Sequence, residues 1–414
     1  MSEHSDVVRQ RAQSLLAGKR ILFVAEAVTL AHVARPLALS SALENSGCEL
    51  NFACDPNYHW LLKDFGGSVH ALPSIDSAHF LHALSQGRPV YDEATLSRYV
   101  ADDLELLKQV RPDVVVGDFR LSLSVSARLA QVPYLTISNA YWSPYVRQAY
   151  PIPEHPLAQR FGLTVAQFLF GLARPLVFAH HTLPLNRLRR RHGLPPLGFN
   201  LNRVYTDADH VLYADVPEMF TMQGLPENHH FLGPILWSPP VPKPDWWQRI
   251  PLDRPILYVT LGSSGQARLL PTVLEALAAL PVTVLLAGSG QRLPTTLPDN
   301  LLAADYLPGM EAAKLAQLVI CNGGSPTSHQ ALAAGVPVLG LPSNLDQFLN
   351  MQAVEASGAG LLLRADRADT ASIRLAVEKM RATASYTEAA QRIAHIFDHY
   401  PAGPRFKQLV ETLR

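Results

Sequence analysis

Short apolar runs of strand length alternate with helical stretches along most of this chain, and that alternation constrains the fold more than any other feature. Residues 20–27 (RILFVAEA) form one run, and a helical pattern over 33–46 follows it and ends at Gly47. Residues 113–117 (DVVVG) form another run, directly after a helical pattern over 96–110. Continuous apolar runs are typical of parallel strands buried on both faces. The pattern therefore predicts βαβ units and a parallel sheet.

The alternation stops in the middle of the chain and then starts again. Residues 256–261 (ILYVTL) and 282–287 (VTVLLA) are new strand-like runs. Before them lies a proline-rich stretch typical of a stiff linker, with Pro239, Pro240, Pro242 and Pro244 close together. We predict an α/β protein of two Rossmann-like domains, 1–240 and 255–385, joined by a linker over 241–254. Ligands of such sheets bind at the carboxyl ends of strands, so the cleft between the domains is the expected site.

The composition excludes several classes of function. The chain has 414 residues and a formal net charge of +0, which gives no electrostatic basis for binding nucleic acid. The chain has three cysteines, Cys48, Cys54 and Cys321. This small, odd number indicates reduced thiols in a cytoplasmic protein. The histidine pairs at 180–181 and 229–230 have no third ligand at a suitable spacing, so we expect no metal site.

One long apolar stretch, 161–179, raises the question of a membrane. Gln167, Arg174 and Pro175 interrupt it, so we interpret it as a buried or pocket-lining helix and not as a membrane span. An arginine cluster over 187–191 follows shortly after. A solvated helix face is the preferred interpretation of that cluster, and peripheral contact with a membrane stays open.

The most informative stretch is 319–360. An apolar run ends at Asn322, and Gly323 and Gly324 allow a tight turn before Ser325 and Thr327 open a helix. Free backbone N–H groups and the positive end of the helix dipole favour a diphosphate at such a helix start. The alternative is an ordinary helix cap after a tight turn, and the turn alone does not decide between the two.

The whole stretch resembles the donor-binding signature of family 1 glycosyltransferases, the group that includes plant and bacterial small-molecule transferases and the macrolide enzymes. The resemblance extends more weakly over nearly the whole chain. The positions that match occur in the family's order: Gly323, Gly324, Thr327, Ala331-Leu332, Gly335-Val336-Pro337, Pro342, Asp346-Gln347 and Asn350. The resemblance implies the GT-B architecture, in which two Rossmann-like domains face each other across a cleft and C-terminal helices, here 386–414, pack back on the first domain.

The same resemblance implies a donor site in the second domain. Donor phosphates would meet the turn Gly262-Ser263-Ser264 and the helix start at Ser325 and Thr327. Tyr306 would stack on the nucleobase, where relatives have Trp, and Asp346 and Gln347 would bind hydroxyls of the donor sugar.

Two positions depart from the signature. Asn322 replaces the usual phosphate-contacting His, and Gln330 replaces the usual ribose-binding Glu, which puts the identity of the donor in doubt.

His32 is the candidate general base. It lies after the first strand-like run, where the family has a Gly-His-x-x-Pro pattern, although Ala31 replaces the Gly and Pro36 comes one residue late. Imidazole titrates near neutral pH, which suits a base. Asp118 directly follows the run over 113–117 and matches the family's Asp that orients this His. The alternatives are a surface His at a helix start and an Asp that caps the next helix.

The resemblance implies an inverting transferase that moves a hexose from a UDP- or dTDP-sugar to a hydroxyl of a small, partly apolar acceptor, without a metal or another cofactor. Aromatic and aliphatic residues over 139–150 and 161–178 could line the acceptor pocket. Two alternatives stay open. A nucleotide-sugar epimerase has the same architecture, and a non-catalytic sugar-nucleotide-binding homologue would tolerate the departures at Asn322 and Gln330.

Overall fold

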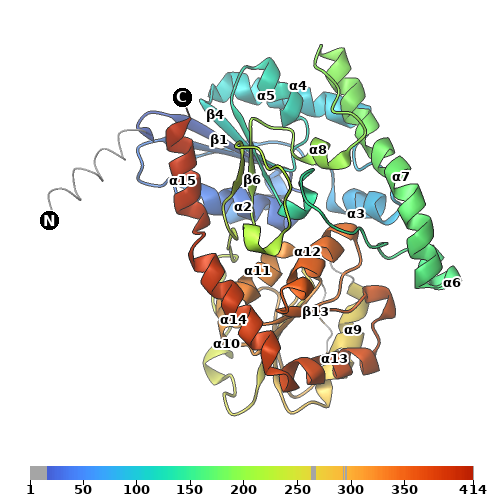
Figure 1. Ribbon diagram of the computed structural model, residues 1–414. Coiled ribbons are helices and arrows are strands. Elements are labelled where there is room, and N and C mark those ends of the chain that lie inside the picture. The colour runs from blue at the N-terminus through green and yellow to red at the C-terminus, as the bar shows by residue number, and fades with distance from the viewer. Residues whose placement is uncertain (1–15, 263–266, 292, 294–295, 414) are drawn as a thin grey trace.

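The computed structural model describes residues 16–262, 267–291, 293 and 296–413. Within them the chain forms two α/β domains, one above the other in Figure 1. The first domain holds a seven-stranded sheet in the order β3-β2-β1-β4-β5-β6-β7, and the second a six-stranded sheet in the order β10-β9-β8-β11-β12-β13. The strand pairs in both sheets are parallel. The predicted fold class, two Rossmann-like domains, is confirmed.

The strands alternate with helices in both domains. The strands of the first are β1 (Arg20–Ala25), β2 (Glu49–Cys54), β3 (Ser68–Ala71), β4 (Val114–Asp118), β5 (Tyr134–Ser138), β6 (His210–Tyr213) and β7 (His229–Phe231). Its helices are α2 (Leu30–Ser41), α3 (Ser77–Ser85), α4 (Glu93–Val110), α5 (Leu123–Leu129), α6 (Pro156–Phe161), α7 (Leu163–Arg191) and α8 (Leu201–Tyr205). The strands of the second are β8 (Ile256–Thr260), β9 (Thr283–Ala287), β10 (Leu301–Ala304), β11 (Leu318–Cys321), β12 (Val338–Gly340) and β13 (Gly360–Leu362). The later helices are α9 (Leu270–Ala278), α10 (Gly309–Leu315), α11 (Ser325–Ala333), α12 (Leu345–Ala356), α13 (Thr370–Ala382), α14 (Ala384–Asp398) and α15 (Ala402–Thr412).

Local sequence explains where these elements begin and end. Asp92 caps α4 by accepting a hydrogen bond from Thr95 N. The helix ends at Arg111, which has a left-handed φ of 48° and stands directly before Pro112. Strands β1 and β4 are almost entirely buried, as their continuous apolar sequences predict for strands covered on both faces.

The strand orders place one topological switch point in each domain. In the first sheet β1 lies between β2 and β4, and Ala25 pairs with Asp118. In the second sheet β8 lies between β9 and β11, and Thr260 pairs with Cys321. Connections leave in opposite directions at such a point, and the crevice between them is where α/β sheets bind ligands. The chain after β1 and β4 therefore comes together in the first domain, and the chain after β8 and β11 in the second.

The C-terminal helices divide between the two domains. α14 packs on the second domain, where Ala389, Ile393 and Phe397 enter the core. α15 packs on the first, where Phe406 and Val410 join a core formed by residues of β1, β2 and β4. Figure 1 shows α14 beside the second domain and α15 beside the first. The packing expected of the whole segment 386–414 is therefore seen for α15, while α14 covers the second domain.

Helix α7 differs from its expected environment. Among the described residues it is the one helix that is long and apolar enough to cross a membrane, with a mean hydropathy of 1.3 over its most apolar 18 residues, and only 6% of that window is buried. Of the two environments predicted for this stretch, the pocket-lining one is seen, because one side of α7 lines a cavity, while its outward side is not buried. One apolar stretch can serve two faces of a helix, and sequence alone does not say whether both are covered.

Candidate active site

A cavity of about 750 Å³ opens between the two domains. The first domain contributes His32, Asp118 and residues of both segments expected to line an acceptor pocket. The second domain contributes the start of α11 and the start of α12. Several apolar lining residues were not foreseen from the sequence, because they come from separate loops and helices: Phe80, Leu81, Phe119, Leu201 and Tyr205.

His32 and Asp118 meet at the switch point of the first sheet. His32 lies in the first turn of α2, and its Nδ1 is 2.8 Å from Asp118 Oδ1 at the end of β4. The imidazole also stacks on the ring of Phe119, with centroids 4.9 Å apart. Its side chain is 17% exposed whereas that of Asp118 is fully buried. A buried carboxylate that accepts from Nδ1–H fixes the tautomer in which Nε2 holds the free electron pair.

Arg35 is a site residue that the sequence reasoning missed. Its Nε donates to Asp118 Oδ2 at 2.8 Å, and its Nη2 donates to Oδ1 at 2.7 Å. Its Nη1 donates to Asn139 Oδ1 at 2.7 Å. Burial disfavours the charged guanidinium, but the carboxylate of Asp118 outweighs this and raises the pKa of Arg35. The available signal was its spacing, because residues three apart share a helix face and Arg35 follows His32 by one turn of α2.

A chain of buried polar groups continues from Arg35 to the second domain. Asn139 Nδ2 donates to Asp215 Oδ2 at 3.1 Å, and the other oxygen of Asp215 lies 3.4 Å from His329 Nε2 on α11. Burial raises the pKa of Asp215 to about 6 and lowers the pKa of His329 to about 3. This contact connects the loop beside the His32–Asp118 pair to the helix predicted to bind the donor.

The start of α11 has the geometry of an anion site. Gly324 is its N-cap and makes no side-chain cap, while Asn322 Oδ1 accepts from Gly324 N at 3.1 Å. Gly323 has φ 81°, and a Cβ there would lie 2.6 Å from Met351 Cγ, so glycine is required. Ser325 and Thr327 lie in the first turn, and Ser325 lines the cavity. The N–H groups of a first turn have no partner within their own helix.

Other donor-site candidates lie around this helix start. Gly262 has φ 65°, and a Cβ there would approach Asn322 Nδ2 to 3.1 Å, so the two turns after β8 and β11 are adjacent. Ser263 and Ser264 lie outside the described residues.

Tyr306 faces Trp60 of the first domain, with ring centroids 6.0 Å apart. The Gln330 amide donates to the backbone oxygen of Trp237 just before the linker, a partner that the sequence did not predict.

Asp346 and Gln347 have different environments although they are adjacent. Asp346 lines the cavity and accepts from Trp142 Nε1 at 2.7 Å and from the Tyr141 hydroxyl at 3.4 Å, both in the first domain. Gln347 is 2% exposed and forms a capping box with Asn344 at the start of α12. Two first-domain side chains therefore hold Asp346, and Gln347 stabilises the turn that positions it.

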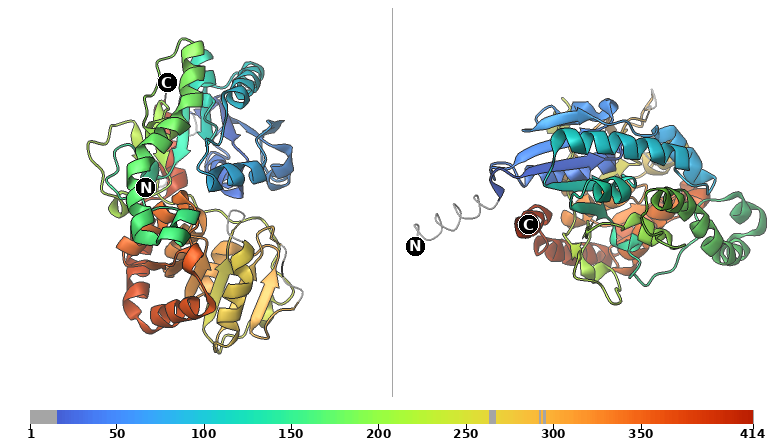
Figure 2. Two further views of the ribbon diagram at one scale, coloured as in Figure 1. Left: turned by 90° about the vertical axis from the view of Figure 1, so that its right-hand side faces the viewer. Right: turned by 90° about the horizontal axis from the view of Figure 1, so that it is seen from above.

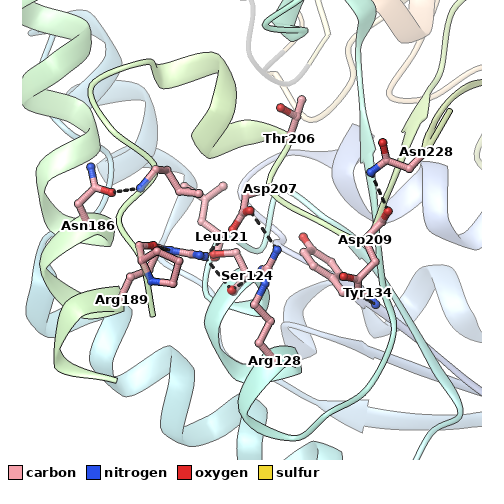
Figure 3. A network of polar contacts seen from close by, with 12 residues as sticks. Leu121, Ser124, Arg128, Tyr134, Asn186, Arg189, Thr206, Asp207, Asp209 and Asn228 are labelled. Atoms are coloured by element: carbon pink, nitrogen blue, oxygen red, sulfur yellow. Dashed lines mark hydrogen bonds and ion pairs between the residues drawn. The ribbon is translucent and has the colours of Figure 1, made fainter. Parts of the chain in front are cut away.

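One acidic pair in the first domain was overlooked. Asp207 and Asp209 match the Asp-x-Asp pattern of metal-dependent transferases. Asp207 pairs with Arg128 and Arg189, and Asp209 Oδ2 accepts from Tyr134 N at 2.8 Å (Figure 3). Both carboxylates thus stabilise the first domain, since two arginines neutralise one and the backbone engages the other. Within the described part of the chain, no group of three or more His, Cys, Asp or Glu residues has the arrangement of a metal site.

Comparison with known proteins identifies the family. The C-terminal domain family of erythromycin biosynthesis protein CIII-like proteins matches residues 271–412. A PGL/p-HBAD biosynthesis glycosyltransferase of Mycobacterium tuberculosis is 52% identical over 95% of this chain and 92% of its own length. A PGL/p-HBAD biosynthesis rhamnosyltransferase of Mycobacterium bovis is 52% identical over 95% of this chain and 87% of its own. An inactive PGL/p-HBAD biosynthesis glycosyltransferase of Mycobacterium bovis is 52% identical over 63% of this chain and 71% of its own.

Solved structures agree on the fold. The glycotransferase of kitacinnamycin superposes with a TM-score of 0.70 at 18% identity, over 95% of this chain and 98% of that one. The glycosyltransferase VinC, solved in complex with dTDP, superposes with a TM-score of 0.66 at 21% identity, over 94% of this chain and 98% of that one. The long, highly identical matches and the shared fold show that this chain belongs to the family 1 glycosyltransferases of the GT-B fold, which transfer a sugar to a small acceptor.

Proposed function

We propose that this glycosyltransferase moves a hexose, with inversion, from a dTDP- or UDP-sugar to a hydroxyl of a small, partly apolar acceptor, with His32 as the base. The observation that carries the proposal is the contact between His32 Nδ1 and Asp118 Oδ1, on a cavity whose opposite wall includes the start of α11. The name of the rhamnosyltransferase relative supports rhamnose as the first sugar to test, and the dTDP in the VinC structure supports dTDP as the first nucleotide.

The proposed reaction begins with proton transfer. The acceptor hydroxyl gives its proton to His32 Nε2 while its oxygen attacks the anomeric carbon from the side opposite the diphosphate. The bond from that carbon to the diphosphate oxygen breaks, and the diphosphate leaves with the electron pair. Asp118 accepts the hydrogen bond of Nδ1–H and stabilises the imidazolium that forms. Inversion follows because attack and departure occur on opposite faces in one step.

The leaving group is stabilised by the second domain in this proposal. The first-turn N–H groups of α11 and the dipole of that helix favour the charge that develops on the diphosphate, with Ser325 and Thr327 as further donors. Asn322 directly follows β11 and lies next to Gly262 in the turn after β8, so its side-chain amide is at the same place. This arrangement supports catalysis without a divalent metal or another cofactor.

The acceptor side of the cavity supports a partly apolar substrate. Trp142, Phe170 and Phe178 come from the two segments expected to line it, and Phe119 lies beside His32. We propose a cytoplasmic enzyme with no membrane span and no nucleic-acid partner. The free thiols Cys48, Cys54 and Cys321 support the compartment, since thiols persist where the medium is reducing.

A panel of nucleotides tests this proposal directly. A ligand that binds only the native state raises the melting temperature, so dTDP or UDP should raise it and NAD and ATP should not. Because one relative is named as inactive, the same protein is then given dTDP-rhamnose and a phenolic or alcoholic acceptor. A shift with NAD alone would exclude a nucleotide-sugar site. Stabilisation by dTDP without turnover of any acceptor would instead support a non-catalytic binding protein.

A further inference from the structure

Helices α6 and α7 carry seven of the fourteen large apolar side chains that are exposed in the described chain. Phe168, Leu172 and Leu176 are 67%, 64% and 76% exposed. The exposed apolar residues on the two helices, which we call the α7 face, are Phe161, Leu163, Val165, Phe168, Leu169, Leu172 and Leu176. Figures 1 and 2 show α7 at the outer edge of the first domain, with α6 at the end nearest the second domain.

The opposite side of the same helix is also apolar. Phe170, Val177 and Phe178 line the cavity, so α7 is the wall between the cavity and the α7 face. Arg174 points to the same inner side, where its guanidinium lies 4.2 Å from the centre of the Tyr150 ring. From Leu163 to Leu176 the helix thus carries no charge on its outer side. A helix that is apolar all round is normally buried in a core or in lipid, and here one side lacks a cover within the described chain.

Positive charge lies at both ends of the α7 face. Arg160 on α6 is exposed at one end. Arg187 and Arg190 are exposed at the other, about three and four turns after Leu176 on the same helical side. An apolar strip flanked by arginines is the pattern of a helix that lies in the surface of an anionic membrane, with its apolar side among the acyl chains and its cations at the headgroups.

The same charges argue against a parallel pair of copies as the cover. A two-fold interface through one helix face is self-complementary, and with the two helices parallel each residue of the face meets the same residue of the other copy. Arg160, Arg187 and Arg190 would then each lie near their own counterparts, and like charges across an interface cost affinity.

We propose that the α7 face docks the enzyme on an anionic lipid bilayer, with α7 lying parallel to the membrane surface. Docking brings the cavity wall formed by Phe170, Val177 and Phe178 next to the lipid. Where the proposed function holds, an acceptor with an apolar tail can then reach His32 without first dissolving in water. The lipid contact itself depends only on the exposed face and its arginines.

Vesicle flotation of the full chain tests the docking. The probes are phosphatidylcholine vesicles and the same vesicles with about a third phosphatidylglycerol. The wild type should float with the anionic vesicles, and the fraction bound should fall as salt rises. The combined variant Phe168→Ser, Leu172→Ser, Leu176→Ser should bind at least about 10-fold more weakly, because three apolar side chains no longer enter lipid. Arg187→Glu with Arg190→Glu should lose binding to the anionic vesicles.

Matched controls separate docking from general surface effects. Leu252 in the predicted linker and Leu375 on α13 are 76% and 68% exposed, and Leu252→Ser with Leu375→Ser should bind vesicles like the wild type. Absence of wild-type binding, or equal binding by the α7-face variant, overturns the proposal. Loss of a concentration-dependent dimer in the α7-face variant, with no vesicle binding by the wild type, would assign the face to self-association. Melting shifts with dTDP report the proposed function separately and should be the same in all these proteins.

Discussion

Arg35 binds both carboxylate oxygens of Asp118, at 2.8 Å from Nε and 2.7 Å from Nη2. His32 shares one of those oxygens, so the carboxylate that orients the proposed base is also neutralised by a guanidinium. Arg35 Nη2 lies 3.3 Å from His32 Nδ1, close enough for its charge to act on the imidazole. The orientation of His32 therefore depends on a carboxylate that Arg35 also holds, and both of these charged groups are buried.

The first prediction concerns His32 itself. His32→Ala should lower turnover by about 100-fold or more, the usual contribution of a positioned base. Binding of dTDP, measured by calorimetry, should change little, because the proposed phosphate contacts come from the second domain. His395→Ala, an exposed histidine on α14, is the control and should leave both quantities unchanged. Wild-type turnover in His32→Ala would mean that the base is elsewhere.

Removing Arg35 should slow turnover by acting through Asp118. In Arg35→Met the buried carboxylate loses both hydrogen bonds from the guanidinium and no longer holds His32 in one orientation, so kcat should fall while the affinity for dTDP stays the same. The variant should also lose about 3–5 kcal/mol of stability, as expected when one partner of a buried ion pair is removed. Arg35→Lys keeps the charge and should lose less of both. Wild-type turnover in a folded Arg35→Met would mean that Arg35 has a structural role alone.

Two side chains of the first domain donate hydrogen bonds to Asp346, and these bonds predict competition with hydroxyls of the donor sugar. Trp142→Phe removes the 2.7 Å hydrogen bond from the indole to Asp346. If sugar hydroxyls bind Asp346, the affinity for a dTDP-sugar should rise by about 2- to 10-fold, the worth of one hydrogen bond, while the affinity for dTDP stays the same. Calorimetry with both ligands makes the comparison. Weaker binding of the dTDP-sugar in Trp142→Phe would show instead that the indole positions Asp346 for the donor.

The His329–Asp215 pair predicts opposite pH effects on stability. Because the pKa of His329 is lowered from 6.5 to about 3, the unfolded chain takes up a proton between these values that the folded protein does not, and stability falls as pH drops. Because the pKa of Asp215 is raised from 3.8 to about 6, the folded protein holds a proton there that the unfolded chain lacks, and stability rises as pH drops.

Two variants separate these effects. Relative to the wild type, His329→Gln should gain melting temperature as pH falls from 6.5 to 4.5, and Asp215→Asn should lose it. For each variant, the difference from the wild type in the free energy of unfolding should change by at most about 1.4 kcal/mol per pH unit. Parallel curves for both variants and the wild type would mean that neither group has a shifted pKa.

Chelation should not stop the reaction. In the proposed mechanism the start of α11 takes the role that a metal has in other transferases, and Asp207 of the Asp-x-Asp pair is engaged by two arginines. Turnover in excess EDTA should match turnover in added Mg²⁺ or Mn²⁺. Loss of activity in chelator that Mn²⁺ restores would contradict the metal-independent mechanism, and Asp207→Asn would then identify whether this pair holds the ion.

The sequence by itself determined the architecture, because the periodicity that specifies a buried strand or a helix lies in neighbouring residues. The apolar runs in the sequence predicted the strands β1, β4, β8 and β11. They also predicted the positions of the turns after these strands, which include His32, Asp118 and Asn322. Since parallel strands bring their carboxyl ends to one edge, the meeting of His32 with Asp118 was also within reach of the sequence.

Only the tertiary structure decided the partners that come from distant parts of the chain. The contacts of Arg35 with Asn139, of Asp346 with Trp142 and of Gln330 with the backbone at Trp237 span from about one hundred to two hundred residues, and they depend on how the loops and the two domains pack. The same holds for α7. Its composition predicts an apolar helix, but whether protein covers its outer side is set by the position of the helix at the edge of the first domain, which no local pattern encodes.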